Sequence, residues 1–317
     1  MKIVSAFFRL IRWPNLFFIA LTQLLFYHCI GILIQEQHVV LNIEQSTNPI
    51  YIYLTIAASV FIAAAGYIIN DYFDLPIDYL NKPSKIVIDK IIKRRWGILW
   101  HLILSAAGLV CSFYVSFQTA QWLIVIVNAL VVLSLWFYST HFKKRLLIGN
   151  VLISALTAWV IFVVFLLCRN ILIQFYQSSI DALFAISHLF KFAVLYGGFA
   201  FIITLVREVV KDMEDMLGDA GFGCQTMPIK WGVPVTKVFA AVWMVVAIAS
   251  MGILQVYAWY LGWRLSILYV SVSIILPLIW MIFQLKKAST PKDYHQLSNM
   301  LKWVMLAGIL SMLFFKF

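Results

Sequence analysis

Nine apolar runs constrain this chain more than any other feature of its sequence. Each run is close to the roughly 20 residues that an α-helix needs to cross the hydrocarbon core of a bilayer. Two runs contain a lysine, Lys191 or Lys302, near enough to an end for the ammonium group to reach the membrane surface. The runs are 13–34, 50–69, 96–117, 120–140, 146–168, 185–206, 238–263, 265–285 and 297–315. The sequence therefore predicts an all-α integral membrane protein with nine transmembrane helices.

The composition excludes a soluble protein. Hydrophobic residues make up 63% of the 317 residues and charged residues 12%, whereas a globular domain is about half apolar and one quarter charged. The formal net charge of +11 does not indicate a nucleic-acid partner, because such an excess in a membrane protein usually marks loops that face anionic lipid.

The four cysteines lack C-x-x-C or metal-ligand spacing, so we expect no disulfide framework. No Ser-, Pro- or Gly-rich linker interrupts the chain, and we expect one domain over residues 1–317. The oligomeric state is left open.

Basic residues determine the expected orientation. With a cytoplasmic N-terminus, nineteen Lys and Arg residues fall in cytoplasmic segments, and only Arg169, Arg264 and Lys316 fall outside. Cytoplasmic segments of membrane proteins are enriched in Lys and Arg. We therefore expect a multi-pass protein of a bacterial or archaeal plasma membrane, with its N-terminus inside and its C-terminus outside.

The acidic residues are concentrated in two cytoplasmic segments. Nine of the thirteen acids lie within residues 70–95 and 207–237, which follow the second and sixth apolar runs and are expected to be long polar loops. Two triplets share the spacing i, i+3, i+7, which places three carboxylates on one helix face in each case. Pro76 should kink or end the helix within the first triplet. The triplets are Asp71, Asp74 and Asp78, and Asp212, Asp215 and Asp219.

Stacked carboxylates repel one another, so a counter-charge is expected. Magnesium prefers carboxylate oxygens and is usually completed by water and phosphate oxygens. Two acidic triplets therefore suggest Mg²⁺ ions that hold a diphosphate. An ordinary solvated acidic loop is the alternative, and the repeated spacing in a chain with so few acids argues against it.

The combination resembles the UbiA superfamily of intramembrane prenyltransferases. The family motif N-D-x-x-D-x-x-x-D is matched by Asn70, Asp71, Asp74 and Asp78, and its second motif, D-x-x-D-x-x-x-D, by Asp212, Asp215 and Asp219. Smaller matches are Asn81-Lys82-Pro83, Tyr138 with Lys143-Lys144 and Gly149-Asn150, and Thr226-x-Pro228. The resemblance implies nine spans, a cytoplasmic active site, Mg²⁺ as cofactor, and transfer of a prenyl group from its diphosphate to a lipid or aromatic acceptor. It implies that Asn70 and the six aspartates hold the metal.

The resemblance also suggests the remaining site residues. Lys143, Lys144, Arg207 and Lys211 are candidates to neutralise diphosphate oxygens. Two alternatives stay open, namely a membrane-anchoring role for the lysine pair and an ion pair between Arg207 and Glu208 or another neighbouring acid. The wording of both motifs is most similar to the digeranylgeranylglyceryl phosphate synthase branch, which implies a geranylgeranyl donor and geranylgeranylglyceryl phosphate as acceptor. The family continues R-P-I-x-S-G after Asn-Lys-Pro, whereas this chain has Ser84-Lys85-Ile86.

Other functions were weighed against this one. An aromatic prenyltransferase of quinone, haem O or chlorophyll biosynthesis shares the implied fold and metal site and stays an alternative. A divalent-ion or lipid transporter would need acids inside the spans, and the cores of the predicted spans have none. CDP-alcohol phosphotransferases need D-G-x-x-A-R followed by G-x-x-x-D-x-x-x-D, which neither acidic segment contains.

Overall fold

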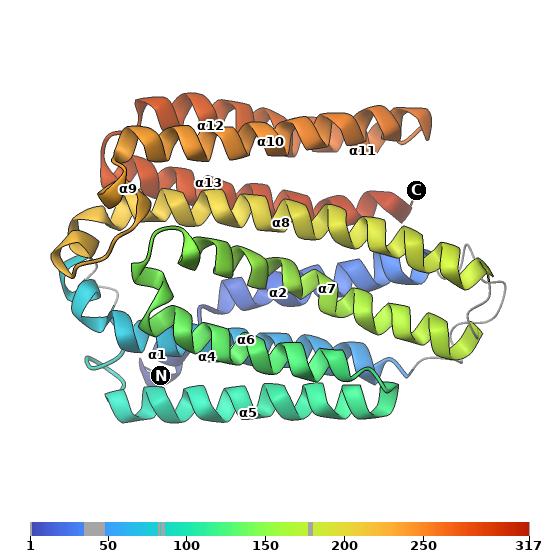
Figure 1. The fold of residues 1–317 in the computed structure, drawn as a ribbon, viewed down its shortest axis with the longest axis horizontal. Coiled ribbons are helices and arrows are strands. Elements are labelled where there is room, and N and C mark those ends of the chain that lie inside the picture. Colours follow the sequence, from blue (N-terminus) through green and yellow to red (C-terminus); the bar gives the residue numbers. More distant parts are fainter. Residues whose placement is uncertain (1, 35–47, 82, 84–85, 177–179, 317) are drawn as a thin grey trace. The chain divides into compact units, whose positions relative to one another are not determined.

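The structure is a computed structural model that describes residues 2–34, 48–81, 83, 86–176 and 180–316 (Figure 1). Over these ranges the chain is helical, and the only β-type pairing among them is a single bridge between Ile88 and Ile92. None of the four cysteines, Cys29, Cys111, Cys168 and Cys224, is part of a disulfide in the structure.

Nine helical segments in the described ranges are long and apolar enough to cross a membrane, which confirms the predicted number. Short elements lie between or before them: α1 (Lys2–Leu10), η3 (Phe142–Lys144) and α9 (Met227–Lys230). The spans are α2 (Trp13–Phe26) with η1 (Tyr27–Gly31), α4 (Ile50–Asn81), α5 (Arg94–Thr119), α6 (Trp122–Thr140), α7 (Ile148–Tyr176), α8 (Ile180–Gly221), α10 (Val233–Tyr260), α11 (Arg264–Val270) with η4 (Ser271–Ile275) and α12 (Leu276–Lys287), and α13 (Pro291–Leu310) with η5 (Ser311–Lys316).

Two helices are much longer than their apolar runs. Helix α4 continues to Asn81 and α8 to Gly221, so both acidic triplets lie on helices. The expectation of loops that begin at residues 70 and 207 was therefore wrong. An apolar run marks only the part of a helix that suits lipid, whereas the backbone hydrogen bonds of a helix are satisfied internally and persist beyond that part.

Pro76 does not end α4, which excludes one of the two outcomes expected from the sequence, a kink or an end. Its ring removes one backbone donor, which leaves the carbonyl of Tyr72 without its usual helical partner. Pro76 itself is exposed and lies near the polar end of the helix. Water is available to solvate the freed carbonyl there, so the helix tolerates the residue.

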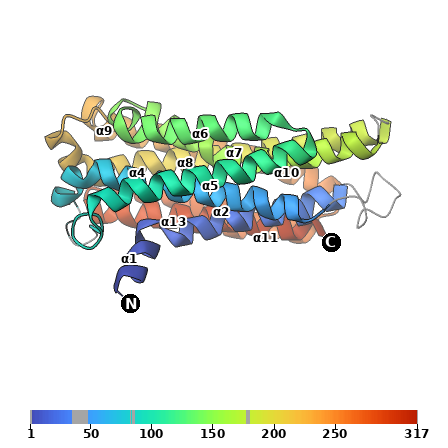
Figure 2. The same ribbon diagram turned by 90° about the horizontal axis from the view of Figure 1, so that it is seen from below.

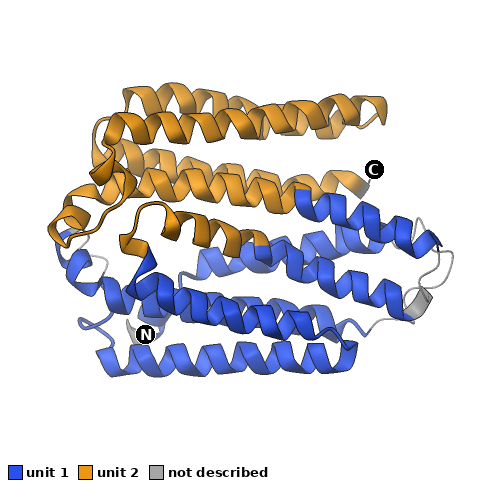
Figure 3. Ribbon diagram, viewed as in Figure 1, with its two compact units in different colours: residues 1–142, 159–194 blue, residues 143–158, 195–317 orange. Residues whose placement is uncertain are grey.

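The chain divides into two compact units, residues 1–142 with 159–194 and residues 143–158 with 195–317 (Figure 3). In the first unit, α4 packs against α2, α5 and α6. Gly108 of α5 lets the two backbones approach, since a Cβ there would lie 3.1 Å from the carbonyl oxygen of Ala58 on α4. His101 of α5 adds a hydrogen-bond contact from Nδ1 to the carbonyl oxygen of Ala65, at 3.0 Å.

The second unit is built around the C-terminal part of α8, with α10, α12 and α13. Its apolar core includes Ile203 and Val206 of α8, Met244 of α10 and Leu301 of α13. Helix α13 begins with a capping box, in which the Asp293 amide donates to Thr290 Oγ1 and the Thr290 amide donates to Asp293 Oδ2. This unit contains the second acidic triplet together with Lys143 and Lys144.

Candidate active site

The first acidic cluster, Asn70, Asp71, Asp74 and Asp78, occupies the last turns of α4. Asn70 Nδ2 donates a hydrogen bond of 2.6 Å to Asp74 Oδ2 across one helical turn. Asp74 is buried, with 6% of its surface exposed. The amide oxygen of Asn70 is also buried and has no hydrogen-bond partner among the described residues. A buried oxygen left without a donor is an available ligand for a cation.

Asp71 forms an ion pair with Arg12, a residue from outside the cluster. Arg12 donates from a terminal guanidinium nitrogen to Asp71 Oδ1 at 2.6 Å, and the guanidinium carbon lies 5.1 Å from the ring centroid of Tyr67. Burial by itself would lower the pKa of Arg12, but the Asp71 carboxylate outweighs this effect and raises it. Arg12 has φ 52°, a left-handed conformation that costs an L-residue about 1–2 kcal/mol. The contacts with Asp71 and Tyr67 offset that cost.

The second acidic cluster, Asp212, Asp215 and Asp219, lies on the last turns of α8. Asn150, which is buried near the start of α7, donates from Nδ2 to Asp212 Oδ2 at 2.8 Å. Asp219 is also buried, with 5% of its surface exposed. The amide of Gln225 donates to the carbonyl oxygen of Lys144 at 2.8 Å, which holds the turn after α6 beside the segment that follows α8.

Two of the predicted diphosphate-binding cations share one carboxylate. Glu208 accepts from Arg207 at 2.9 Å and from the ammonium group of Lys211 at 3.0 Å and 3.3 Å. The Glu208 side chain is 12% exposed, so water screens these ion pairs only partly. The Arg207 Nε–H is buried and has no hydrogen-bond partner among the described residues. The ion pair considered from the sequence is therefore present, and one guanidinium donor is still available for an anion.

The structure does not by itself assemble a metal centre. Within the described ranges, no three His, Cys, Asp or Glu side chains lie close enough together to hold a metal ion. The two clusters also belong to different compact units, and each is described here separately. The donor set nevertheless fits a hard divalent cation, because it consists of carboxylate oxygens and the available amide oxygen of Asn70.

Four contacts of these clusters were not anticipated from the sequence as site features. They involve Arg12, Asn150, Glu208 as a shared partner, and His295, whose Nδ1 lies 2.9 Å from Glu214 Oε1. Arg12 and Asp71 are 59 residues apart, and Asn150 and Asp212 are 62 apart. Only the position of Glu208, one residue from Arg207 and three from Lys211 in a helix, was a usable signal.

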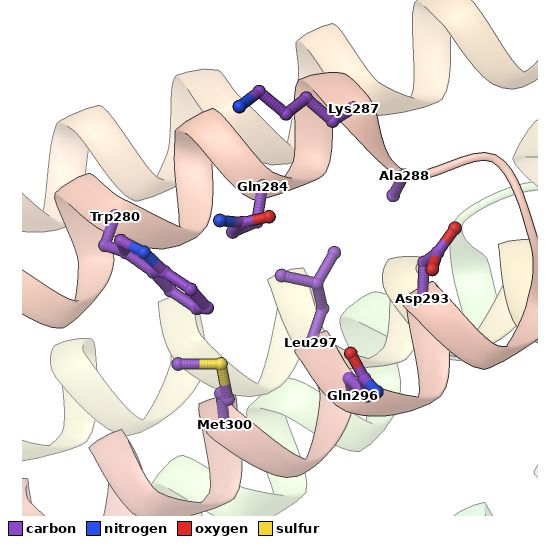
Figure 4. A pocket seen from close by; sticks show the side chains of 8 residues that line it. All are labelled: Trp280, Gln284, Lys287, Ala288, Asp293, Gln296, Leu297 and Met300. Carbon is purple, nitrogen blue, oxygen red and sulfur yellow. The ribbon is translucent and has the colours of Figure 1, made fainter.

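A pocket on the second unit lies away from these residues (Figure 4). It lies between α12 and α13, and the side chains of Trp280, Gln284 and Met300 surround it. None of the predicted site residues is among its described lining residues, which are Trp280, Gln284, Lys287, Ala288, Asp293, Gln296, Leu297 and Met300. The pocket is therefore not part of the candidate active site.

The helical architecture and the acidic helix ends are those of a polytopic membrane protein with polar chemistry at one end of its spans. Comparison with known proteins identifies the family. A model of the UbiA prenyltransferase family matches residues 24–306. A digeranylgeranylglyceryl phosphate synthase from Methanothermobacter thermautotrophicus is 31% identical over 238 residues, which are 75% of each chain.

Solved structures show the same fold. A UbiA homologue from Aeropyrum pernix K1 in its apo form superimposes with a TM-score of 0.63 at 16% identity, over 92% of this chain and 96% of that one. A UbiA homologue from Archaeoglobus fulgidus, bound to DMAPP and Mg²⁺, gives 0.53 at 13% identity, over 96% and 98%. The chain belongs to the UbiA prenyltransferase family. It is therefore an integral membrane prenyltransferase, as the sequence motifs implied.

Proposed function

We propose that this protein transfers a geranylgeranyl group from its diphosphate to the free hydroxyl of geranylgeranylglyceryl phosphate, in a reaction that depends on Mg²⁺. The name of the Methanothermobacter relative, which matches three quarters of the chain, supports this acceptor. The Mg²⁺ in the Archaeoglobus homologue supports the cofactor. The available amide oxygen of Asn70 next to the buried Asp74 is the observation in this chain that best supports metal binding.

Each of the two acidic clusters would bind Mg²⁺. Bound Mg²⁺ would withdraw charge from the diphosphate and favour its departure from the allylic carbon. Asn70, Asp74 and Asp78 lie four residues apart and share a face of α4. Asp71 lies at the edge of the same face, but its carboxylate is paired with Arg12, so the other three would be the better-placed ligands of the first cluster. Asp212, Asp215 and Asp219 would supply the ligands from α8.

The basic residues of α8 would bind the diphosphate. Arg207 has a buried Nε–H available for a phosphate oxygen, and a guanidinium can donate two parallel hydrogen bonds to such a group. Glu208 holds Arg207 and Lys211 in fixed positions before the substrate arrives. Lys143 and Lys144, in the turn after α6, would add positive charge. When the carbon–oxygen bond to the diphosphate breaks, these cations would stabilise the leaving group.

The acceptor would be recognised through its phosphate. Lys93, Arg94 and Arg95 at the start of α5 are exposed, and the guanidinium carbon of Arg94 lies 4.8 Å from the ring centroid of Tyr72. Tyr72 is a neighbour of Asp71, so these cations lie on the side of the first unit that carries the first cluster. Lys82 and Lys85, two further basic residues of the segment before α5, lie outside the described residues. A phosphorylated acceptor needs this positive charge more than an aromatic carboxylate does.

The test is an acceptor competition with the purified protein. The protein is incubated with Mg²⁺, geranylgeranyl diphosphate, geranylgeranylglyceryl phosphate, hydroxybenzoate and dihydroxynaphthoate, and products are identified by mass spectrometry. We expect the ether of the glyceryl phosphate as the main product and none in excess EDTA. Prenylation of only the aromatic acids would contradict the proposed acceptor. Full activity in excess EDTA would contradict the proposed dependence on Mg²⁺.

A further inference from the structure

Helix α1 is a short helix that the proposed reaction does not use. It covers Lys2–Leu10 and ends just before α2, the first membrane span, which begins at Trp13. Figure 2 shows that α1 leaves the direction of α2 instead of continuing it. The turn between them is made at Arg12, whose left-handed backbone breaks the helix. Because it joins the end of a span, α1 lies where the bilayer meets water.

The described side chains of α1 fall into three sectors. Ala6 and Leu10, with 2% and 0% of their surface exposed, pack into the core of the first unit with Ile68 and Ile88. A second sector is apolar and open, since Val4 and Phe8 are one turn apart and are 61% and 50% exposed. The third sector is polar and also exposed.

The polar sector contains Ser5 and Arg9, which are again one turn apart. At 100° per residue, the polar sector lies about 100° from each of the other two, and the open apolar sector lies about 160° from the buried one. A helix with one face on its own protein, one open apolar face and one polar face is suited to the plane of a membrane interface. A helix surrounded by water would not place Val4 and Phe8 on the same open face.

The surroundings of α1 identify what covers its open face. Trp13 and Phe17, at the start of the first span, are 56% and 55% exposed, and tryptophan is typical of the headgroup level of a bilayer. Arg9 is exposed, as are Arg94 and Arg95 at the start of α5 in the same unit. Such a concentration of positive charge beside an apolar face is complementary to anionic lipid headgroups.

We propose that α1 is an interfacial helix that binds an anionic bilayer surface, with Val4 and Phe8 among the acyl chains near the headgroups and Arg9 at the lipid phosphates. Its buried face belongs to the same apolar core as Ile88 and as Ile68, which lies two residues before Asn70. The helix therefore links the membrane surface to the packing beneath the first acidic cluster. This role does not depend on which acceptor the enzyme prenylates.

The test measures the surroundings of single side chains in the full-length protein. Cys111, the one cysteine that is not fully buried, is replaced by alanine, and Val4→Cys, Phe8→Cys and Ser5→Cys variants are labelled with an environment-sensitive fluorophore. The proteins are placed in vesicles of phosphatidylcholine and phosphatidylglycerol at 7:3. We expect nitroxide lipids to quench labels 4 and 8 at least twofold more than label 5, and aqueous iodide to show the reverse order. Equal iodide quenching at all three positions would overturn the proposal.

Two comparisons separate the bilayer from other occupants and test the charge. If a second copy of the chain covered the face, iodide protection at positions 4 and 8 would fall as the lipid-to-protein ratio of the vesicles is raised, and that result would overturn the proposal. Lipid quenching at position 8 should weaken in phosphatidylcholine alone and in Arg9→Gln. Lys292 is exposed and lies on α13, so Lys292→Gln serves as the control and should leave the lipid quenching at position 8 unchanged. Identical quenching with and without phosphatidylglycerol would overturn the assignment to anionic lipid.

Discussion

Side chains that look equivalent in the motif have different partners in the structure. The sequence treats Asp71, Asp74 and Asp78 as equal members of a triplet. In the structure, the Asp71 carboxylate is neutralised by Arg12, whereas Asp74 is buried beside an amide oxygen that has no donor. A cation would stabilise both groups, because burial disfavours the charge of the carboxylate and the amide oxygen has no donor among the described residues.

Replacing Asp74 should therefore cost much more activity than replacing Asp71. We expect Asp74→Asn to lower kcat by more than about 100-fold, beyond the 10–100-fold typical for removal of an outer-shell partner of a metal. We expect Asp71→Asn to lower kcat by less than about 10-fold. Activity measured against Mg²⁺ concentration should show a weaker apparent Mg²⁺ affinity only for Asp74→Asn. Similar losses in both variants would contradict the distinction.

Arg207 allows a second test at the level of one residue. Lysine keeps the positive charge but lacks the Nε–H that is buried without a partner. A hydrogen bond to a charged group contributes about 1.5–3 kcal/mol, so Arg207→Lys should raise the KM for the prenyl diphosphate by about 10-fold or more. The exposed Lys230→Gln on α9 is the matched control and should leave this KM unchanged. An unchanged KM in Arg207→Lys would show that Arg207 Nε does not bind the diphosphate.

At the scale of elements, helix packing depends on close approaches that hydropathy does not report. Gly308 of α13 faces Phe199 of α8, and a Cβ at residue 308 would lie 3.1 Å from Phe199 Cζ and closer still to Cε1. Phe199 is 8% exposed, so its ring has little room to move. Gly252 of α10 lies in a helix too, but a Cβ there would meet nothing within 4 Å.

These two glycines form a matched pair for a stability measurement. Gly308→Ala should destabilise the protein by about 1–3 kcal/mol, the usual cost of overpacking, reduced by the better helix propensity of alanine. Gly252→Ala should stabilise it by about 0.5–1 kcal/mol, because only the propensity changes. Thermal unfolding in detergent should give the Tm order Gly252→Ala, wild type, Gly308→Ala. The opposite order would mean that α13 does not pack on α8 through Gly308.

At the scale of the whole molecule, the basic residues still predict the orientation. Nineteen Lys and Arg residues lie on one predicted side and three on the other. A reporter fused after Phe317 should therefore be outside, and one inserted next to Lys90 should be cytoplasmic. Reversed signals would place both acidic clusters outside the cell. They would then be away from the compartment proposed to supply the prenyl diphosphate.

The sequence by itself determined the helical class, the nine spans and the family. Each depends on local information, namely runs of apolar residues long enough for a bilayer and acidic residues at helical spacing. The ends of the helices were less predictable. The apolar runs end where charged residues begin, whereas α4 and α8 continue past that point because the backbone hydrogen bonds of a helix are internal and need no lipid.

Only the tertiary structure decided which polar groups have partners. The pairing of Arg12 with Asp71 and of Asn150 with Asp212 joins residues about 60 positions apart, and no local pattern specifies such a contact. The unsatisfied oxygen of Asn70 and Nε of Arg207 are likewise visible only once every neighbouring donor and acceptor has been placed. The identity of a side chain sets what it can bind, but the packing of the elements around it determines whether that capacity is already used.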